Sequence, residues 1–464
     1  MRVAVVGLGY VGLVTATCLA RLGQEVVGLE ADQDRLSTLL AGDVPYYEPN
    51  LAAELATQLR ERRLSFTGDP AAALVGAEVV LVCVGTPSDA TGHADLKAVL
   101  AVADAIAEVV VDEPVIVIRS TVPVGTTLKV EERINEIRRQ RGLVPVAVLA
   151  NPEFLRTGRA IDDFLRPSRV VIGRTDRATA RELGVLAALY APLEAPVVLC
   201  DAESAELTKN ASNAFLAMRV SFVNELAELC HVTGADIDAV VAGMSEDPRI
   251  GSQFMKPGIG FGGSCLPKDV RSLIASGRDR GLAMTLATAV DAVNRRQPER
   301  VVALLAEFSG RPLDATRVGL LGLAFKPETD DIRDSPALIL ADELHSHGAQ
   351  VVACDPKAGL KAVGGRPWLE LESDPTGVAN GADVLVLGTE WAAYVTADFA
   401  ELAARMRGSL VIDGRNALDA SVVEAAGLRY VGIGRARRGT NGRAGAQSAA
   451  LKKPIPERRE AIAE

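Results

Sequence analysis

The chain has 464 residues, too many for one core of ordinary size, so we expect two or three domains. With 48% hydrophobic and 24% charged residues, its composition is that of a soluble globular protein. The net charge of -10 argues against a general nucleic-acid binder. The six cysteines are scattered, with neither a CxxC pair nor the spacing of a metal site, so we expect a reducing cytoplasm and no metal.

The N-terminal residues predict a dinucleotide-binding fold. Residues 2–6 read as a strand, residues 13–22 as a helix and residues 24–29 as a second strand. The G-x-G-x-x-G motif between the first strand and the helix contains Gly7, Gly9 and Gly12. The first glycine makes the tight turn, the second lets the backbone reach a pyrophosphate, and the third permits close helix packing. These glycines also argue against a signal peptide or a membrane span over residues 3–20, so we expect no membrane partner.

An acidic residue ends the second strand at the position that selects the cofactor. Glu30 stands 18 positions after the last glycine of the motif. Its carboxylate would hold the ribose hydroxyls and repel a 2′-phosphate, which favours NAD over NADP. Arg35 is either near the adenosine half of the cofactor or a solvated helix residue, and the sequence does not decide between the two.

Further strands recur at the spacing of alternating strands and helices. They are continuous Val, Ile and Leu runs, typical of a parallel sheet covered on both faces, at residues 79–84, 115–119, 146–150, 169–173 and 196–200. Two of them end in polar turns that contain Thr86 and Thr121. Because ligands lie at the carboxyl ends of strands in open α/β sheets, these hydroxyls are placed to touch the cofactor, with a capping role as the alternative. A third strand end brings the carboxylate of Glu153 to the same edge.

Helical periodicity replaces the strands from residue 201 to about residue 297. Residues 205–230 predict one long helix, on which Lys209 and Asn213 are four apart and share a face. Such a pair is ordinarily solvated surface. It gains interest because a glycine-rich stretch follows in the same helical region, with Cys265 just after four glycines in six residues. This cysteine is either a nucleophile whose neighbours favour its thiolate, or a buried residue beside a flexible loop.

A second α/β pattern begins beyond about residue 315, after a linker at residues 311–316. We expect strands at residues 318–325, 350–354, 383–388 and 410–412. Lys326, Arg333 and Arg415 come directly after strands, in turns or early helix positions. After residue 434 the chain turns basic and polar, which predicts a disordered tail.

Five strings, which occur in order from residue 1 to about residue 434, together resemble the UDP-glucose/GDP-mannose dehydrogenase family. They are Val5-Val6-Gly7-Leu8-Gly9-Tyr10-Val11-Gly12, Ser120-Thr121-Val122-Pro123-Val124-Gly125, Asn151-Pro152-Glu153-Phe154-Leu155-Arg156, Gly260-Phe261-Gly262-Gly263-Ser264-Cys265-Leu266-Pro267-Lys268-Asp269 and Gly322-Leu323-Ala324-Phe325-Lys326-Pro327-Glu328-Thr329-Asp330-Asp331-Ile332-Arg333. Residues 249–251 and 254–258 are similar to the branch of the family that oxidises UDP-glucose.

The resemblance implies a four-electron oxidation of a primary alcohol to a carboxylate, using two NAD molecules in turn. By that similarity Cys265 is the nucleophile. The sugar alcohol gives a hydride to NAD, and the thiolate captures the resulting aldehyde as a thiohemiacetal. A second hydride transfer leaves a thioester, which water hydrolyses.

The same resemblance assigns roles to the residues around the cysteine. Lys209 matches the lysine that stabilises oxyanions forming at C6, and Asn213 matches its hydrogen-bonding companion. Asp269 matches the carboxylate that assists the water or the thiol, and Glu153 the one that acts on the hydrolytic water. Thr121 matches the hydroxyl near both cofactor and water.

The implied binding residues fall into two sets. Lys256, Lys326 and Arg415 would pair with the diphosphate and uridine of the substrate, Arg249 would reach a neighbouring subunit's site, and Arg333 would contact the cofactor. In full, the expected cofactor-binding residues are Gly7, Gly9, Tyr10, Val11, Gly12, Glu30, Arg35, Thr86, Thr121, Thr157 and Arg333. The expected substrate-binding residues are Glu153, Phe154, Leu155, Arg156, Lys209, Asn213, Arg249, Phe254, Lys256, Gly262, Lys326 and Arg415.

Two positions depart from the family pattern. The family usually has a second glutamate after the Phe-Leu-Arg segment, and Thr157 stands in its place. This position lies near nicotinamide and substrate in the family, so cofactor geometry and rate are in question there. The aspartate that is more common at the end of the second strand is Glu30, which keeps the charge.

We therefore expect an α/β protein with two Rossmann-like doubly wound parallel-sheet domains joined by a central helical segment. The predicted parts are an NAD domain over residues 1–200, a helical dimerisation and catalytic segment over 201–300, a nucleotide-sugar domain over 315–434 and a tail over 435–464. The resemblance also suggests a homodimer or higher homo-oligomer. A GDP-mannose 6-dehydrogenase, a UDP-N-acetylhexosamine 6-dehydrogenase and a non-catalytic sensor of nucleotide sugars or NAD stay open as alternatives.

Overall fold

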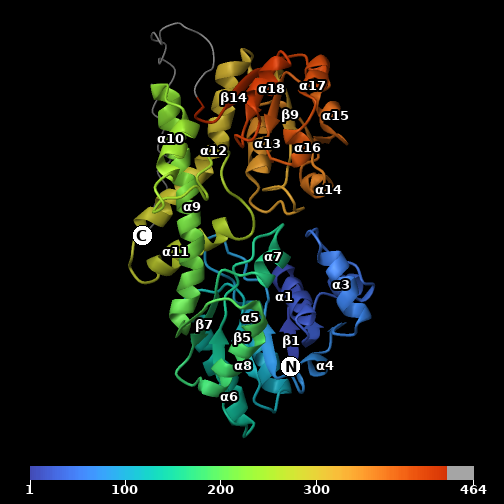
Figure 1. The fold of residues 1–464 in the computed structure, drawn as a ribbon, viewed down its shortest axis with the longest axis vertical. Helices are drawn as coiled ribbons and strands as arrows, with labels where there is room; N and C mark the ends of the chain where they lie inside the picture. The colour runs from blue at the N-terminus through green and yellow to red at the C-terminus, as the bar shows by residue number, and fades with distance from the viewer. Residues whose placement is uncertain (436–464) are drawn as a thin grey trace, which may run out of the picture.

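The computed structural model describes residues 1–435, which form two α/β lobes joined by long helices (Figure 1). The N-lobe runs to the end of β8, the helices α9 to α12 follow, and the C-lobe begins at β9. The predicted fold class is confirmed. The tail predicted over residues 435–464 lies outside the described residues, except for Arg435. Within residues 1–435 no helix is long and apolar enough to cross a membrane.

The N-lobe is built on an eight-stranded sheet in the order β3-β2-β1-β4-β5-β6-β7-β8. The first six positions have the strand order of a dinucleotide-binding fold, and those strands run parallel. The pair β7–β8 is parallel within itself but meets β6 antiparallel, with Ala150 opposite Gly173. The strands are β1 (Arg2–Val6), β2 (Glu25–Leu29), β3 (Leu64–Thr67), β4 (Val79–Val82), β5 (Val115–Ile118), β6 (Val148–Ala150), β7 (Val170–Arg174) and β8 (Val197–Asp201).

Alternate residues of each central strand enter two different cores. In β1, Val3 and Val5 pack into one apolar cluster, whereas Ala4 and Val6 pack into another on the opposite face. Burial on both faces explains why these strands read as unbroken apolar runs. The helices of this lobe are α1 (Tyr10–Arg21), α2 (Gln33–Leu40), α3 (Leu51–Arg60), α4 (Pro70–Leu74), α5 (Lys97–Val109), α6 (Thr126–Gln140), α7 (Ala160–Leu165) and α8 (Ala180–Tyr190), followed by the 3-10 turn η1 (Ala191–Leu193).

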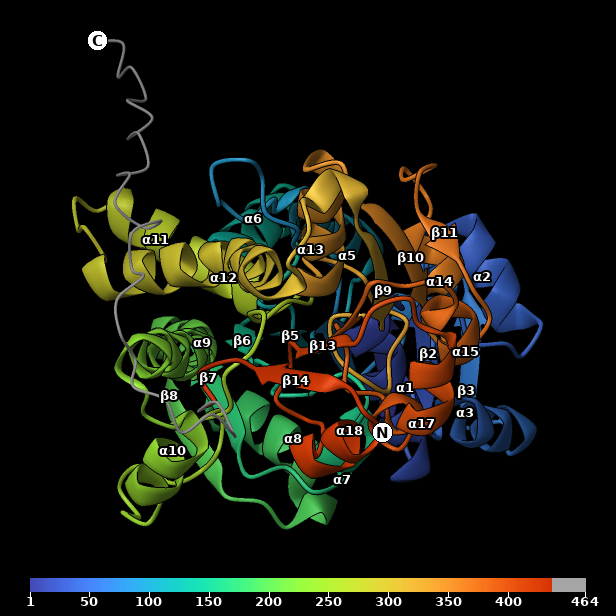
Figure 2. The same ribbon diagram turned by 90° about the horizontal axis from the view of Figure 1, so that it is seen from above.

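Helix α9 (Ala202–Thr233) runs beside both lobes. Its 32 residues contain no glycine or proline, and at 1.5 Å per residue they extend for about 48 Å. Asp201 caps its first turn by accepting a hydrogen bond from the Ser204 N–H (2.7 Å), and Gly234 ends it in a left-handed conformation. Helices α11 (Leu266–Arg278) and α12 (Thr285–Ser309) pack against it, and α10 (Ile237–Ser245) follows its end (Figure 2).

The C-lobe repeats the topology of the N-lobe with six parallel strands in the order β11-β10-β9-β12-β13-β14. The strands are β9 (Arg317–Leu321), β10 (Gln350–Cys354), β11 (Glu370–Leu371), β12 (Val384–Leu387), β13 (Leu410–Asp413) and β14 (Arg429–Gly432). The helices are α13 (Pro336–Ser346), α14 (Gly359–Ala362), α15 (Pro375–Ala379), α16 (Ala392–Val395), α17 (Phe399–Arg405) and α18 (Ala420–Ala425), and the 3-10 turn η2 (Leu313–Ala315) precedes the lobe.

The strand predicted over residues 318–325 is shorter than expected, because β9 stops at Leu321. Gly322 follows with φ +97, and a side chain there would collide with Thr389 at 2.4 Å. The chain therefore turns at Gly322, and Phe325 and Lys326 lie in a loop instead of a strand. This turn places Lys326 beside the cavity between the lobes.

Candidate active site

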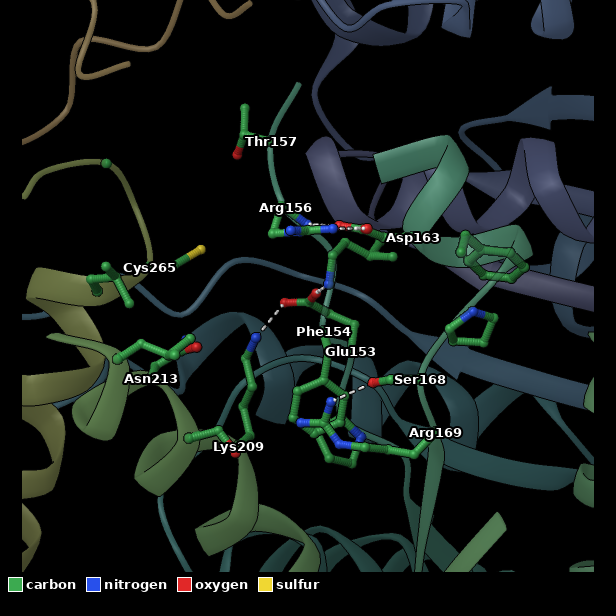
Figure 3. A pocket seen from close by; sticks show the side chains of 18 of the residues that line it. Glu153, Phe154, Arg156, Thr157, Asp163, Ser168, Arg169, Lys209, Asn213 and Cys265 are labelled. Atoms are coloured by element: carbon green, nitrogen blue, oxygen red, sulfur yellow. Dashed lines mark hydrogen bonds and ion pairs between the residues drawn. The ribbon is translucent and has the colours of Figure 1, made fainter. Parts of the chain in front are cut away.

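A cavity of about 660 Å³ lies where the two lobes meet the central helices. The loop between β6 and α7 (residues 151–159, the β6–α7 loop) supplies Glu153 and its neighbours, and α9 supplies Lys209 and Asn213. The stretch before α11 adds Cys265, and the C-lobe adds Lys326. Segments far apart in the sequence thus bring a thiol, two amines, an amide and a carboxylate to one space (Figure 3).

Cys265 stands at the N-cap of α11, and Figure 3 shows its sulfur pointing into the cavity. Ser264 Oγ lies 3.7 Å from the sulfur. Burial raises the pKa of the thiol, and the carboxylates of Glu153 and Asp269 act in the same direction, whereas Lys209 opposes them. The resting side chain is therefore a protonated thiol, and it needs a proton acceptor when it attacks.

Lys209 and Glu153 form a buried ion pair at the floor of the cavity. Lys209 Nζ lies 3.0 Å from Glu153 Oε1, and their side chains are only 3% and 4% exposed. Burial alone would raise the pKa of Glu153, but Lys209 and the Leu155 N–H lower it below its ordinary value. Burial likewise disfavours the ammonium of Lys209, but Glu153, Cys265 and Asp269 raise its pKa overall. Both groups are therefore charged, and the cavity holds a fixed cation beside the thiol.

Asp269 is held one turn into α11 by two donors. Asn213 Nδ2 donates to its Oδ2 at 2.6 Å, and Lys268 Nζ donates to its Oδ1 at 2.6 Å. With 1% of its surface exposed, Asp269 links α9 to α11 beneath Cys265. The sequence predicted Asn213 and Asp269 as site residues, but it gave no role to Lys268.

Two side chains of the β6–α7 loop, Phe154 and Arg156, are held by charged partners. The guanidinium of Arg169 lies 3.6 Å from the centroid of the Phe154 ring, and Lys209 Nζ lies 5.4 Å from it. Arg156 makes a bidentate pair with Asp163 at 2.9 and 2.7 Å. Leu155 and Thr157 also line the cavity. Arg169 and Asp163 lie later in the chain, and no local motif in the sequence pointed to them.

The glycine turn of the N-lobe has the shape that a dinucleotide requires. Gly7 has φ +88, a conformation that favours glycine. A side chain at Gly12 would stand 1.8 Å from the Gly7 carbonyl oxygen, so α1 can pack this close to the turn only with glycine at position 12. A methyl group at Gly9 would meet nothing within 4 Å, which leaves open space beside the backbone. Tyr10 and Val11 begin the first turn of α1, and the first N–H groups of a helix have no partner within it, which suits an anion.

Glu30 sits behind this turn, where the sequence placed it. Its Oε2 accepts a hydrogen bond from the Leu8 N–H at 2.9 Å, and Arg35 Nη1 lies 3.1 Å from the same oxygen. Arg35 therefore accompanies Glu30 at the end of β2. An open turn, a helix N-terminus and an acidic residue at the end of β2 together fit the phosphates and ribose of NAD.

Thr86 and Thr121 lie at the ends of β4 and β5, on the same edge of the sheet as the glycine turn. The Thr86 hydroxyl donates to the Thr121 carbonyl oxygen at 2.7 Å, which joins the two turns. Neither residue is among those that line the cavity around Cys265. The Thr86 hydroxyl thus has a structural role, because it binds the backbone of the neighbouring turn. Contact with a cofactor stays a prediction for both residues.

The predicted nucleotide-binding residues divide into two groups. Phe254, Gly262 and Lys326 line the cavity, and burial lowers the pKa of Lys326. Arg249, Lys256 and Arg333 are not among the lining residues. Arg249 pairs with Asp247, and Arg333 pairs with Asp331. Their predicted contacts with substrate or cofactor stay predictions.

Arg415 is bound to the protein's own backbone, and its predicted contact with the diphosphate or uridine stays a prediction. Its Nε, Nη1 and Nη2 donate to the backbone carbonyl oxygens of Gly388, Gly260 and Phe325, at 2.7, 3.0 and 3.0 Å. It therefore ties the glycine-rich stretch before Cys265 to the C-lobe. The guanidinium has five N–H groups, so donors remain for a ligand.

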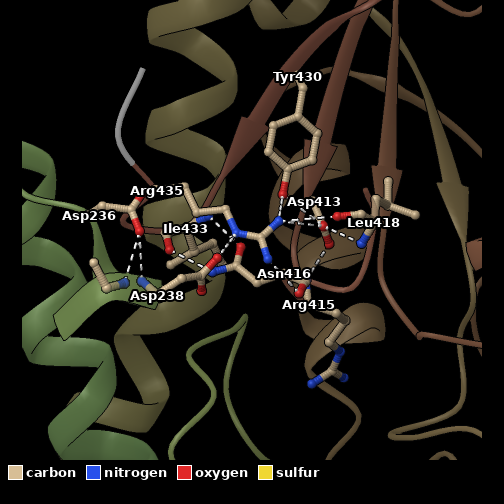
Figure 4. Close-up of polar contacts among 10 residues, drawn as sticks. Asp236, Asp238, Asp413, Arg415, Asn416, Leu418, Tyr430, Ile433 and Arg435 are labelled. Carbon is tan, nitrogen blue, oxygen red and sulfur yellow. Dashed lines mark hydrogen bonds and ion pairs between the residues drawn. The ribbon is translucent and has the colours of Figure 1, made fainter. Parts of the chain in front are cut away.

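A buried polar network holds the backbone around Arg415 in place (Figure 4). Asp413, which is fully buried, accepts hydrogen bonds from the Arg415 N–H at 3.1 Å and the Leu418 N–H at 2.8 Å. Tyr430 Oη donates to the same carboxylate at 2.9 Å. Arg435 faces the network, with its Nη1 3.7 Å from Asp413 Oδ2, and its Nε donates to Asp238 of α10 at 2.6 Å.

No group of three or more His, Cys, Asp and Glu side chains in residues 1–435 is arranged to hold a metal ion. The cavity places a thiol near a buried lysine, next to a dinucleotide-binding lobe. This combination defines the class, which is the NAD-dependent oxidoreductases that use a covalent cysteine adduct.

Comparison with known proteins gives the family. Three models of the UDP-glucose/GDP-mannose dehydrogenase family match the chain, namely the NAD binding domain over residues 1–194, the central domain over 203–296 and the UDP binding domain over 319–420. The chain belongs to this family, and its cofactor is NAD. The first and third models correspond to the two lobes, and the second to most of the central helices.

Relatives match over nearly their whole length. A UDP-glucose 6-dehydrogenase of Pseudomonas aeruginosa is 44% identical over 447 residues, which cover 95% of this chain and 98% of the relative. One of Rhizobium meliloti is 40% identical over 439 residues, covering 94% and 100%. The solved structure of a UDP-glucose dehydrogenase from Pyrobaculum islandicum superposes with a TM-score of 0.86 at 37% identity, covering 94% of this chain and 98% of that one.

Proposed function

We propose that the protein oxidises UDP-glucose to UDP-glucuronate, using two NAD molecules in turn. The observation that carries this proposal is the Cys265 thiol in the cavity beside the buried Lys209–Glu153 pair. The net reaction consumes UDP-glucose, two NAD⁺ and one water, and it yields UDP-glucuronate, two NADH and three protons. The UDP binding domain model and the names of the relatives support the nucleotide and the sugar.

The protein contributes charge, a nucleophile and proton transfer. NAD, when bound at the glycine turn, supplies the hydride acceptor for both oxidations. Lys209 stabilises the negative charge that develops on the C6 oxygen, because it stays cationic against Glu153. Asn213 lies four residues along the same face of α9 and fixes Asp269, which is the carboxylate nearest in sequence to the thiol.

The cysteine holds the aldehyde between the two oxidations. Its sulfur bonds to the C6 carbonyl carbon as the C=O π bond opens, and the thiol proton passes to the C6 oxygen, which gives a thiohemiacetal. Oxidation of this adduct leaves a thioester on Cys265. Water then adds to the thioester, the C–S bond breaks, and the thiol and the carboxylate are released. Glu153 accepts the proton of that water, since its lowered pKa keeps it ionised at neutral pH.

Two other sugar nucleotides compete with UDP-glucose as the substrate. The string from Gly262 to Asp269 also fits a GDP-mannose 6-dehydrogenase, and a UDP-N-acetylmannosamine dehydrogenase of Pyrococcus horikoshii superposes with a TM-score of 0.82 at 28% identity. A protein that senses nucleotide sugars without turnover has Thr157 as its only support. The charged residues around Cys265 argue against that alternative.

The decisive measurement is NADH formation at 340 nm with limiting UDP-glucose, with GDP-mannose and UDP-N-acetylglucosamine assayed beside it. We expect two NADH per UDP-glucose, and loss of this stoichiometry in a Cys265→Ala variant, which cannot form the adduct that the second oxidation needs. If only another sugar nucleotide were turned over, the proposed mechanism would stand and UDP-glucose would be wrong as the substrate. If all three sugar nucleotides bound without turnover, the protein would not be an enzyme for them, and the sensor would be the better explanation.

We also propose a homodimer formed along α9 and the edge strand β8. Large apolar side chains are exposed on both elements, and those on α9 recur along the whole helix: Leu207, Phe215, Phe222, Leu229 and Val232 on α9, with Val197, Val198 and Leu199 on β8. A row of exposed apolar side chains along a helix is typical of an interaction surface, and a second copy of the chain would bury it. Light scattering on the purified protein tests the dimer.

The cytoplasm is the proposed location, because all six cysteines are free thiols and Cys265 must stay reduced.

A further inference from the structure

Glu48 is a buried carboxylate that the mechanism does not use. It precedes α3, and 5% of its surface is exposed. Its side chain accepts hydrogen bonds from Tyr10 Oη at 2.5 Å, from the Gly158 N–H at 2.6 Å and from the Ala160 N–H at 2.7 Å. One side chain therefore connects the first residue of α1 with the end of the β6–α7 loop.

The two ends of this connection belong to the two binding sites. Tyr10 lies in the glycine turn that fits NAD, and Tyr46 packs against it with ring centroids 5.3 Å apart. The Tyr46 hydroxyl also donates to the Tyr10 carbonyl oxygen at 3.3 Å. Gly158 directly follows Thr157, whose side chain lines the cavity with Arg156. A shift of the glycine turn would thus be carried through Glu48 to the cavity wall.

The neighbouring residue extends the connection to the C-lobe. Tyr47 Oη donates to Glu328 Oε2 at 3.3 Å, and Lys357 Nζ lies 4.4 Å from the centre of the Tyr47 ring. A side chain at Gly158 would stand 3.0 Å from the Glu328 carbonyl oxygen, so the β6–α7 loop also touches this segment. Glu328 is two residues beyond Lys326, which faces the cavity.

We propose that Glu48 is a positioning residue that couples NAD binding to sugar-nucleotide binding by joining the glycine turn to the β6–α7 loop. Binding of NAD fixes the turn and Tyr10, and Glu48 thereby holds Thr157 and Arg156 in place for the second ligand. By reciprocity the sugar nucleotide raises the affinity for NAD by the same factor. The proposal rests on the proposed function, because it takes the second ligand to be UDP-glucose.

A purely structural role is the alternative. The carboxylate also satisfies backbone N–H groups at the start of α7, which is what a helix cap does. Loss of a cap lowers the stability of the lobe, but it leaves the ratio between the affinities with and without the other ligand unchanged. That ratio is therefore the readout that separates the two roles.

The experiment measures binding by calorimetry in the Cys265→Ala background, where no cysteine adduct forms and the second oxidation is blocked. The NAD dissociation constant is determined with and without saturating UDP-glucose, and the ratio of the two values is the coupling factor. We expect a factor of about 5 or more in this reference, within the usual range of coupling between sites. Adding Glu48→Gln should bring it to within twofold of one. Tyr10→Phe removes only the hydroxyl and should lower it without unfolding the lobe.

A matched control is Asp398→Asn in the C-lobe. Asp398 also accepts two backbone N–H groups at a helix start, but it lies outside the cavity, so the coupling factor should stay unchanged. A reference factor of one, or an unchanged factor in both Glu48→Gln and Tyr10→Phe, would overturn the proposal. If UDP-glucose does not bind at all, the proposed substrate is wrong, and the same titration is run with the sugar nucleotide that turns over.

Discussion

The Lys209–Glu153 pair decides the charge inside the cavity. Neither residue could stay ionised alone at 3–4% exposure, because burial penalises each charge, and each is kept charged by the other. The pair thus provides the two charges that the reaction needs at different stages. The cation serves the oxyanion at C6, and the carboxylate serves the hydrolytic water.

Replacing the lysine affects both contributions, each through a different measurement. In Lys209→Met we expect kcat to fall by about 10²–10³, the usual cost of losing one donor to a developing oxyanion. Glu153 would lose the neighbour that lowers its pKa, and burial would then raise that pKa above the ordinary value. The acid limb of the kcat/KM profile should therefore move to higher pH. A profile with an unchanged acid limb would show that Glu153 is not the group that titrates there.

The reactivity of the thiol gives a second prediction at this scale. Burial and the nearby carboxylates raise the pKa of Cys265 above that of an ordinary thiol, so little thiolate exists at neutral pH. The rate of alkylation by iodoacetamide should rise with pH and keep rising above pH 9. Since Lys209 lowers this pKa, Lys209→Met should alkylate more slowly at any pH below the plateau. Mass spectrometry of the peptide that carries Cys265 separates it from the other five cysteines.

The sequence predicted the reacting residues better than it predicted their supports. Cys265, Lys209 and Glu153 belong to recognisable strings, and the structure brings all three to one cavity. Asp163, which pairs with Arg156, and Arg169, which stacks on Phe154, stand in no such string. Their positions depend on the path of the β6–α7 loop, and local sequence does not specify that path.

The start of α1 shows how one element serves both stability and binding. Gly12 is needed because its α-carbon approaches the Gly7 carbonyl, whereas Gly9 faces open space. The same motif therefore contains one glycine required by the fold and one whose small size serves only the ligand. The two requirements can be separated by adding a single methyl group at each position.

We expect Gly12→Ala and Gly9→Ala to differ in their effect on stability. The methyl of Gly12→Ala would lie 1.8 Å from a backbone oxygen, so this variant should lower both Tm and NAD affinity. In Gly9→Ala the Tm should stay the same, while the KM for NAD rises by about tenfold, equivalent to about 1.4 kcal/mol of binding free energy. Differential scanning fluorimetry and initial rates provide the two measurements. An equal loss of Tm in both variants would contradict this division.

The sequence predicted where most strands lie, but it did not predict the direction in which each strand runs. Unbroken apolar runs indicated most of the strands, because burial on both faces leaves no polar alternation to read. The reversal between β6 and β7 left no such mark, since an apolar run does not show which way its strand points. The short strands β3, β11 and β14 were missed because they are exposed in part and mix polar with apolar residues.

At the scale of the whole molecule, the C-lobe reaches the reacting cysteine through Arg415. This side chain holds the Gly260 and Phe325 carbonyls together, and its own backbone is held by Asp413. Arg435 completes the network and also reaches Asp238 of the central helices. The order of the stretch before Cys265 therefore depends on Asp413 and Arg435, which no local motif in the sequence indicated.

The network gives the last prediction. Arg435→Met removes the cation that faces Asp413 and the donors to the Leu418 and Asn416 carbonyls. Hydrogen bonds to charged groups contribute about 1.5–3 kcal/mol each, so the C-lobe should unfold at a lower temperature. The loop around Arg415 should also loosen, which raises the KM for the sugar nucleotide. The KM for NAD should stay the same, because the glycine turn lies in the other lobe.

The control for this variant is Asp238→Asn. The carboxylate of Asp238 is half exposed, and a surface ion pair contributes about 0–1 kcal/mol, so this change should leave both Tm and KM nearly unaltered. Thermal unfolding and initial rates with each ligand varied in turn provide the readouts. If Arg435→Met lowered Tm but left both KM values unchanged, the network would stabilise the C-lobe without ordering Arg415. If both KM values rose together, the C-lobe would act on the whole cavity, through the contacts of Glu328 and Lys357 with Tyr47 as well as through Arg415.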